Sequence, residues 1–367
     1  MILLNPGPAN TTDTVKRAMT KPDICPREQE FGKVMLRVRD GLARVVDKSG
    51  DFTAVLFLGS GTAGVEAAVS STVPHHGRLL VIDNGSYGAR IAEMARAYGI
   101  AHDVEEFGVG GFPNVGQIKD RLAKTQYTHL AVIHHETSTG MLNPVREIGA
   151  VCREKGVEMI VDAMSSYAAM PIDMADLGAD YLVSTSNKCI QGMAGLTFVI
   201  CRKTTLARLQ PITGRSLYLN LPEQHRFFAK SQQMRYTPPV QIIYALEQAL
   251  TEYEAEGAEG RHRRYMECFT ALDSGMGELG FRRLLPPAQM SRILTAYIEP
   301  DHPSYSFNGM HDRLFSKGFT IYPGKGANKA TFRLANMGAI TPQDMTDFIG
   351  AMRETIHEMA MLPLYAS

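Results

Sequence analysis

The sequence lacks the features by which several classes of protein are recognised. Its 38 basic and 38 acidic residues balance within a chain of 367 residues, and it has no basic stripe, acidic tail or low-complexity segment. No apolar stretch approaches the roughly 20 residues that cross a membrane. We therefore expect a globular protein that binds neither nucleic acid nor a membrane, with more than one domain.

The cysteines argue against a disulfide framework or a zinc site. There are five, an odd number, scattered as Cys25, Cys152, Cys189, Cys201 and Cys268. Such spacing is typical of reduced thiols in the cytosol. The first residues also lack the charged start and long apolar core of a secretion signal, so we expect a cytoplasmic protein.

Short apolar runs alternate with amphipathic stretches from about residue 15 to residue 200. The predicted strands are nearly continuous apolar runs bounded by glycine or polar residues: 53–58, 79–82, 130–133, 159–161, 181–183 and 196–201. Helices are predicted from near Ala63, over 87–98 and over 145–155. This alternation predicts an α/β fold with a mostly parallel sheet covered on both faces.

After Pro238-Pro239 the pattern changes to a long helical stretch that suggests a spine between two domains. The elements predicted there and beyond are helices 240–256, 261–275, 310–317 and 342–359 and strands 294–298, 319–322 and 331–334. The last helix has a clear start, with a hydroxyl at Thr341, a proline next and an acid at Asp344. We predict a large domain over 15–255 and a smaller α+β domain over 256–367 together with 1–14.

Two polar residues follow successive strand candidates at a spacing that favours one kind of chemistry. Asp162 ends the run 159–161, and Lys188 follows 181–183 after a short polar segment. About one strand–helix–strand crossover separates them, so parallel strands would bring both to one sheet edge. Pyridoxal phosphate needs a lysine to hold it as a Schiff base and an acid to keep its pyridine nitrogen protonated. Taken singly, each residue is more often a plain structural acid or a solvated lysine.

A glycine turn after the first strand supplies a candidate phosphate site. In Gly59-Ser60-Gly61-Thr62, small residues let the backbone approach an anion, while hydroxyls and helical N–H groups donate to it. The segment is neither a Walker loop nor a full dinucleotide fingerprint. A plain turn that caps a helix is the alternative.

Two further polar clusters follow strands at the same predicted edge. Tyr87 is placed to stack on a planar cofactor or to pack as an ordinary buried ring, and Arg90 one turn later faces either the site or solvent. Thr137 or Ser138 is placed to donate to the cofactor's phenolic oxygen. His134 and His135 precede these hydroxyl residues. Adjacent residues on a strand point in opposite directions, which argues against binding of one metal ion by both. The sequence has no Gly-x-Ser-x-Gly elbow, which argues against a serine hydrolase.

Arg333 is the lone arginine on a strand of the predicted small domain. Its guanidinium has the geometry to clamp a substrate carboxylate or phosphonate through two hydrogen bonds. A surface arginine is the alternative.

Together these segments resemble the class V, fold-type I pyridoxal-phosphate aminotransferases over nearly the whole chain. The stretches that carry the resemblance are Asn5-Pro6-Gly7-Pro8, Gly59-Ser60-Gly61, 84–90, 136–144, 161–166, 186–192, Ile321-Tyr322-Pro323-Gly324-Lys325 and Phe332-Arg333. One departure is Thr62-Ala63, where some relatives have Ser-Tyr.

The resemblance implies a role for each candidate residue. It makes Lys188 the Schiff-base lysine and Asp162 the partner of the pyridine nitrogen. The implied cofactor-binding residues are Ser60, Gly61, Thr62, Tyr87, Thr137, Asp162, Asn187, Lys188 and Thr237. Thr237 would reach the phosphate of a neighbouring subunit, which implies a homodimer with shared active sites. Arg333 would bind the substrate carboxylate, and no metal is expected.

Within that family, the segment 186–192 is most similar to the branch that acts on 2-aminoethylphosphonate and pyruvate. The products would be phosphonoacetaldehyde and L-alanine. An alanine–glyoxylate or serine–pyruvate enzyme on the same scaffold is the alternative. Cysteine desulfuration would need a reactive thiol near the substrate, and no cysteine follows Cys268. A protein that only binds the cofactor would have to dispense with Lys188 or Asp162.

Overall fold

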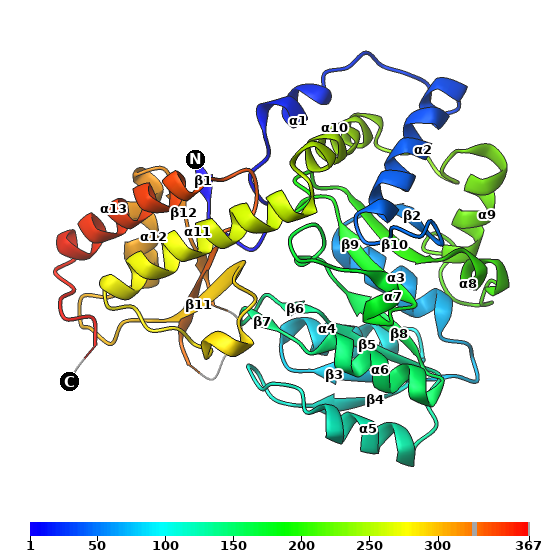
Figure 1. Ribbon diagram of the computed structural model, residues 1–367, viewed down its shortest axis with the longest axis horizontal. Helices are drawn as coiled ribbons and strands as arrows, with labels where there is room; N and C mark the ends of the chain where they lie inside the picture. The colour runs from blue at the N-terminus through cyan, green and yellow to red at the C-terminus, as the bar shows by residue number, and fades with distance from the viewer. Residues whose placement is uncertain (325–328, 366–367) are drawn as a thin grey trace.

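The computed structural model describes residues 1–324 and 329–365 and shows a large sheet region beside a smaller one (Figure 1). The large sheet has seven strands in the order β2-β10-β9-β8-β5-β3-β4. Their bounds, in that order, are Phe52–Leu58, Leu196–Arg202, Tyr181–Thr185, Glu158–Asp162, His129–Ile133, Arg78–Asp83 and Ala101–Glu106. β10 is antiparallel to both of its neighbours, β2 and β9, and every other pair of neighbouring strands in this sheet is parallel. The predicted mostly parallel sheet is therefore confirmed.

Successive residues of each strand enter cores on opposite faces of this sheet. In β3, Leu80 and Ile82 belong to one cluster, while Leu79 and Val81 belong to another. The first cluster packs mainly against α2 (Gln29–Arg44), α5 (Val115–Lys124), α6 (Val145–Lys155), α7 (Met174–Leu177) and α10 (Val240–Glu256). The second packs against α3 (Gly61–Thr72), α4 (Ser86–Ala97), α8 (Lys203–Arg208) and α9 (Leu221–Ser231). The sheet is thus covered on both faces, as its apolar strands predict.

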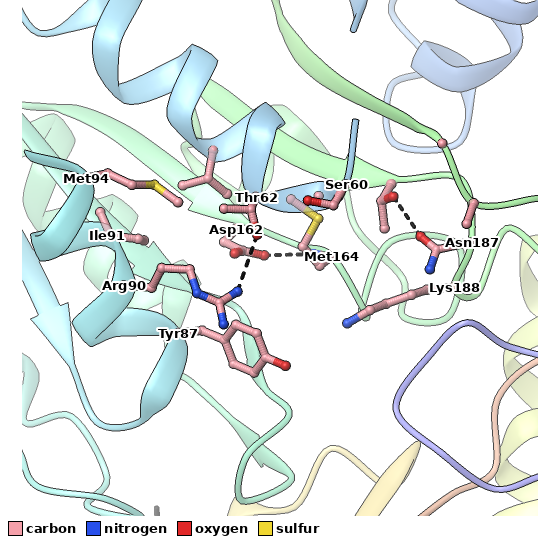
Figure 2. A pocket seen from close by; sticks show the side chains of 15 residues that line it. Ser60, Thr62, Tyr87, Arg90, Ile91, Met94, Asp162, Met164, Asn187 and Lys188 are labelled. Atoms are coloured by element: carbon pink, nitrogen blue, oxygen red, sulfur yellow. Dashed lines mark hydrogen bonds between the residues drawn. The ribbon is translucent and has the colours of Figure 1, made fainter. Parts of the chain in front are cut away.

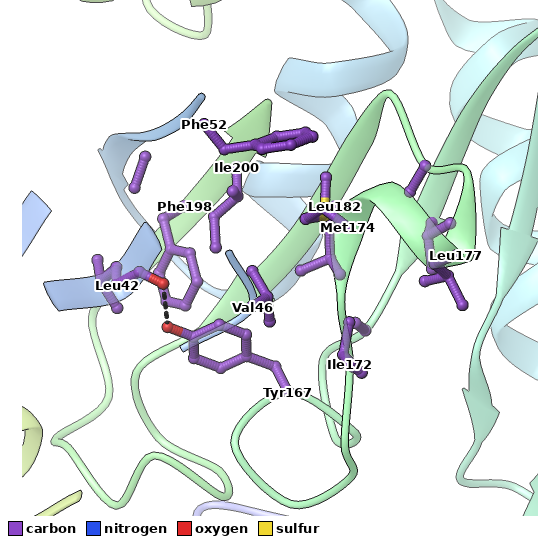
Figure 3. Packing of buried hydrophobic residues seen from close by; sticks show 14 of the residues in the cluster. Leu42, Val46, Phe52, Tyr167, Ile172, Met174, Leu177, Leu182, Phe198 and Ile200 are labelled. Carbon is purple, nitrogen blue, oxygen red and sulfur yellow. Dashed lines mark hydrogen bonds between the residues drawn. The ribbon is translucent and has the colours of Figure 1, made fainter. Parts of the chain in front are cut away.

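Aromatic packing and one buried hydrogen bond fix the first of these cores (Figure 3). The Tyr167 and Phe198 rings meet edge to face with centroids 5.0 Å apart. The Tyr167 hydroxyl donates to the Leu42 carbonyl oxygen at 2.7 Å. This bond satisfies the one polar atom of a fully buried ring and ties α2 to the loop after β8.

The smaller region is built on a three-stranded antiparallel sheet in the order β11-β14-β13. These strands span Leu294–Ile298, Thr331–Ala335 and Tyr322–Pro323, and α11 (Ala258–Glu278), α12 (Phe307–Ser316) and α13 (Pro342–Glu358) accompany them. A turn of 3-10 helix, η1 (Pro287–Gln289), precedes β11. The long helix α11 crosses from the large region to the smaller one (Figure 1). The domain boundaries at 14/15 and 255/256 stay predictions.

The N-terminal segment reaches both regions. Its first strand, β1 (Ile2–Leu3), pairs in parallel with β12 (Phe319–Thr320) of the smaller region. Next along the chain, α1 (Asp13–Ala18) begins at Thr12, whose hydroxyl donates to the Glu252 carboxylate of α10. Residues 4–12 therefore pass between the two regions.

Local signals predicted the strands of the large sheet except β4, together with α3, α4, α6 and α10 to α13, whereas helices such as α2 and α5 were not predicted. Two differences have clear causes. The strand predicted over 319–322 is divided, because Phe319–Thr320 pairs with β1 whereas Tyr322–Pro323 pairs with β14. The edge strand β4 was not predicted, since its sequence Ala-His-Asp-Val-Glu-Glu is polar. Thr341 and Asp344 form the expected reciprocal cap of α13. Lys325 and the C-terminal residues 366–367 of the predicted small domain lie outside the described residues.

No helix within the described residues is both long and apolar enough to span a bilayer. All five cysteines are free thiols, and only Cys25 is exposed.

Gly64 of α3 packs directly on the sheet, so Gly64→Ala should destabilise the fold. A Cβ there would overlap Thr197 Oγ1 and lie 2.8 Å from Val183 Cγ1. We expect a loss of about 1–3 kcal/mol in the free energy of unfolding, measured by urea denaturation. In the control Gly277→Ala, the new methyl group meets nothing within 4 Å, so stability should stay level or rise by about 0.5–1 kcal/mol. Equal stabilities of the two variants would contradict the close packing of α3.

Candidate active site

Asp162 and Lys188 meet at the carboxyl edge of the large sheet. Asp162 is the last residue of β8 and lies opposite Val183 of the parallel neighbour β9, which ends shortly before Lys188. Both side chains line one cavity of about 300 Å³ (Figure 2). The fold thus brings together the carboxylate and the amine that the sequence spacing paired, while their chemical roles stay predictions.

The same cavity is lined by the start of α3 and one face of α4. Ser60, Gly61 and Thr62 form one wall, and Tyr87 and Arg90 form another. A guanidinium N–H of Arg90 (Nη1) donates to Thr62 Oγ1 at 3.3 Å, and its Cζ lies 5.0 Å from the centroid of the Tyr87 ring. Arg90 therefore faces the site, which decides between the two orientations that the sequence left open.

The start of α3 has the chemistry of an anion site. Ser60 occupies the N-cap position, but its side chain makes no capping hydrogen bond, which leaves its hydroxyl for a ligand. A Cβ on Gly61 would run into the Met164 thioether, which would have to shift, so glycine lets this wall and Met164 pack as they do. With the Thr62 hydroxyl, the Arg90 charge and the positive end of the helix, this wall suits a phosphate group.

Lys188 is held between the Tyr87 ring and the N-terminal segment. Its Nζ lies 5.9 Å from the centroid of the Tyr87 ring. A Cβ added to Gly7 would lie 3.2 Å from Lys188 Cγ and 3.3 Å from Cε, and Gly7 has a φ of +123°. The Ala9 N–H donates to the Asn187 carbonyl oxygen at 3.0 Å. The chain start therefore packs against the stem of the lysine, where only glycine fits without strain.

The environment of Asp162 suits an acid that faces a positively charged group. Burial raises the pKa of its carboxyl, while the Met164 N–H and the charges of Lys188 and Arg90 act in the opposite direction. The Met164 N–H donates to Oδ1 at 2.9 Å. A cationic ligand atom in the cavity would favour the ionised carboxylate further.

Arg333 is buried, so the alternative of a surface arginine is wrong. The residue is 2% exposed. Its Nε and Nη2 donate to the Pro323 carbonyl oxygen at 3.0 and 2.8 Å, and its Nη1 donates to the Thr137 carbonyl oxygen at 3.0 Å. Burial lowers its pKa, with Tyr87, Tyr322 and Glu136 acting in the opposite direction. The Tyr87 side chain is a further hydrogen-bond partner, so most of its five N–H donors are already used. Arg333 is not among the residues that line the cavity, and its contact with a substrate anion stays a prediction.

The remaining candidates lie in different surroundings. Asn187 lines the cavity, and its Oδ1 accepts a hydrogen bond from the Thr185 hydroxyl at 2.8 Å. Thr137 is buried in the turn between β6 (His135–Glu136) and β7 (Met141–Leu142) and is not part of the cavity wall. Thr237 is exposed on the segment before α10. The contacts predicted for Thr137 and Thr237 stay predictions.

Sequence reasoning missed several lining residues. Ile91 and Met94 share one face of α4 with Tyr87 and Arg90, and Met164 and Gly195 complete the wall. Helical periodicity would have found the first two, because residues three and four apart lie on one face. Glu136 is also buried close by, where its carboxylate accepts a hydrogen bond from the Tyr87 N–H and burial raises its pKa.

In the part of the chain that the structure describes, no group of three or more His, Cys, Asp or Glu side chains is placed to hold a metal ion.

Comparison with known proteins identifies the family. The family model described as aminotransferase class-V matches residues 13–306. This chain belongs to the class-V aminotransferases. It is 41% identical over 359 residues to a 2-aminoethylphosphonate–pyruvate transaminase of Syntrophobacter fumaroxidans, covering 97% of this chain and 96% of the relative. The enzyme of the same name from Vibrio vulnificus is 41% identical over 360 residues, covering 97% and 98%.

Solved structures support the same fold. The aspartate aminotransferase of subgroup IV from Thermus thermophilus superposes with a TM-score of 0.88 at 25% identity, covering 98% of this class-V chain and 100% of that one. An alanine–glyoxylate aminotransferase from Nostoc superposes with a TM-score of 0.89 at 23% identity, covering 97% and 95%. The predicted fold-type I architecture is therefore confirmed, and the protein is an enzyme of the aminotransferase class.

His134 beside the site should make stability depend on pH. Burial lowers the pKa of its imidazole from 6.5 to about 4, so the unfolded chain binds a proton there between these values and the folded protein does not. The free energy of unfolding should therefore fall by about 3 kcal/mol as pH drops from 6.5 to 4. Urea denaturation at pH 8 and at pH 4 measures this fall. The free energy of unfolding should fall less for His134→Asn than for the unaltered protein. An equal fall in both proteins would contradict the burial of a neutral ring.

Proposed function

We propose that this class-V aminotransferase transfers the amino group of 2-aminoethylphosphonate to pyruvate, with pyridoxal phosphate as cofactor. The products are phosphonoacetaldehyde and L-alanine. The observation that carries the proposal is the convergence of Lys188, Asp162 and the start of α3 on one cavity. The substrates are taken from the shared name of relatives that are 41% identical over 97% of the chain.

The residues of the cavity fit this cofactor. The wall formed by Ser60, Gly61 and Thr62 suits the phosphate, and the Tyr87 ring offers a flat face for the pyridine ring. Asp162 at the end of β8 is the acid for the ring nitrogen, and Lys188 is the amine for the aldehyde carbon. A cavity of about 300 Å³ also lies at the lower end of the range for small-molecule sites.

Bound there, pyridoxal phosphate supplies an electron sink for the electron pair left on the substrate's α-carbon. Lys188 would hold the cofactor, and its Nζ, once freed by the substrate amine, would carry the proton from that carbon to the cofactor's former aldehyde carbon. Asp162 keeps its negative charge opposite the protonated ring nitrogen. Arg333 holds the anionic end of the substrate, and Tyr87 keeps water from one face of the site.

The enzyme is proposed to act as a cytoplasmic homodimer with shared active sites. Thr237 and its neighbour Tyr236 are exposed just before α10, and the Tyr236 ring stacks on Tyr218 with centroids 5.1 Å apart. An exposed polar residue beside an exposed aromatic pair is suited to contact a second copy of the chain. The free thiols fit a reducing compartment.

The competing activities have less support. An alanine–glyoxylate or serine–pyruvate enzyme would use the same Lys188, Asp162 and Arg333, but the relatives at 41% identity carry the phosphonate name. Desulfuration needs a thiolate, and burial raises the pKa of Cys189, the cysteine next to Lys188, to about 12. Such a thiol stays protonated near neutral pH and is a poor nucleophile.

An amino-donor panel tests the substrate. Purified holoenzyme is incubated with pyruvate and, in turn, 2-aminoethylphosphonate, L-serine or L-aspartate, and L-alanine is measured; L-alanine with glyoxylate, followed as glycine, tests the alternative. We expect 2-aminoethylphosphonate to give at least about 100-fold higher kcat/KM than the other donors, which corresponds to about 2.7 kcal/mol of differential transition-state binding. Faster turnover of another donor would reject the phosphonate substrate and keep the enzyme class.

Replacing Lys188 tests whether this residue holds the cofactor. Lys188→Ala should remove the absorbance band near the visible edge that reports covalently held pyridoxal phosphate and should release the cofactor on gel filtration. The control is Lys119→Ala, a surface lysine that pairs with Glu154 at 2.8 Å, and it should keep the band. A Lys188→Ala protein with an unchanged spectrum would show that the cofactor is attached elsewhere or only bound.

A further inference from the structure

The imidazole of His135 bridges the two regions of the molecule. The residue is 3% exposed and lies in β6, at the border between the large sheet and β11 (Figure 1). Its Nδ1 lies 2.8 Å from the hydroxyl of Ser165, and its Nε2 lies 2.8 Å from the hydroxyl of Ser291. Each ring nitrogen therefore forms a hydrogen bond to a different region.

The bond to Ser165 leads to the reacting groups. Ser165 lies in the loop that follows Asp162, and its carbonyl oxygen accepts a hydrogen bond from Cys189 Sγ at 3.0 Å. Cys189 is the residue after Lys188. Through Ser165, His135 is thus joined to both loops that carry the proposed acid and amine.

The bond to Ser291 leads to the arginine that binds the substrate anion. The Ser291 N–H donates to the Gly140 carbonyl oxygen at 2.9 Å, and the chain then enters β11. In β11, Ala296 lies opposite Arg333 of β14. Ser291 is therefore part of the support for the strand that carries Arg333.

The bridge uses a neutral ring. Burial lowers the pKa of His135 well below its ordinary value, and the nearby Lys188 charge lowers it further. A neutral imidazole has one donor and one acceptor nitrogen. Both serine hydroxyls are thus satisfied without a second positive charge beside the reacting amine.

We infer that His135 is a positioning residue that sets the distance between Arg333 and Lys188. It is not among the residues that line the cavity. Its Ser291 bond crosses to the smaller region and carries the effect, while its Ser165 bond orients the ring within the large region. The inference rests on the proposed function, in which Arg333 holds the anionic end of the substrate while Lys188 acts at its amino-bearing carbon. A loosened Ser291 contact would let Arg333 shift and weaken the binding of both substrates.

Two substitutions separate the halves of the bridge. The amide of His135→Asn reaches the place of Nδ1, so this variant keeps the Ser165 bond and loses the Ser291 bond. The longer His135→Gln reaches the place of Nε2 and keeps the Ser291 bond instead. His134→Asn is the matched control, because that neighbouring ring contacts Ser166 through its Nδ1 at 3.0 Å and forms no bond to the smaller region.

Steady-state kinetics of the holoenzyme give the first result. His135→Asn should raise KM for both substrates about tenfold, which matches the loss of one buried hydrogen bond, with kcat within about twofold. His135→Gln and His134→Asn should keep KM near that of the unaltered enzyme. Ser291→Ala should raise KM as much as His135→Asn does. The double variant should have the same KM as either single variant, because both changes remove the same bond. Unchanged KM in His135→Asn, or an equal rise in all three histidine variants, would overturn the inference.

Amide hydrogen exchange gives a second result that needs no substrate. Residues 290–294 of the holoenzyme should exchange faster in His135→Asn than in the unaltered protein and at an unchanged rate in His135→Gln and His134→Asn. Equal exchange in all four proteins would overturn the bridge. If the unaltered enzyme fails to turn over 2-aminoethylphosphonate, the proposed function is rejected, while the exchange rates still decide the role of His135.

Discussion

The site depends on one constraint, which is that β8 and β9 are neighbouring parallel strands. Parallel strands end at the same edge of a sheet, so Asp162 at the end of β8 and Lys188 just after β9 arrive on one cavity. The start of α3 and one face of α4 close the same space. Had β9 run antiparallel to β8, Lys188 would have lain at the opposite edge of the sheet, away from Asp162.

Buried hydrogen bonds join the two regions next to the cavity. Arg333 belongs to the small sheet, yet its Nη1 donates to Thr137 of the large region. His135, two residues earlier, forms hydrogen bonds with Ser165 and Ser291. Buried polar groups must be paired, so these bonds permit only a narrow range of positions of one region relative to the other. In the proposed reaction, that restriction gives Arg333 and Lys188 a fixed separation.

The sequence predicted the local elements well where one signal dominated. Apolar runs located every strand of the large sheet except β4, whose polar residues suit an exposed edge. Sequence could not predict the division of 319–322, because pairing with β1 or β14 depends on chain segments far away. The same limit applies to Arg333. The alternative of a surface residue was wrong, because contact between the two regions buries this side chain.

The sequence by itself determined which groups to expect at the site: an acid and an amine one crossover apart, a glycine-rich turn before a helix and an arginine on a late strand. These follow from local spacing, because strand and helix periods decide which residues stand at the ends of elements. Only the tertiary structure decided that Arg90 faces the cavity, that Gly7 packs on Lys188 and that His135 joins the two regions. Each of these contacts joins residues from separate segments, and their distance is set by packing that no local pattern encodes.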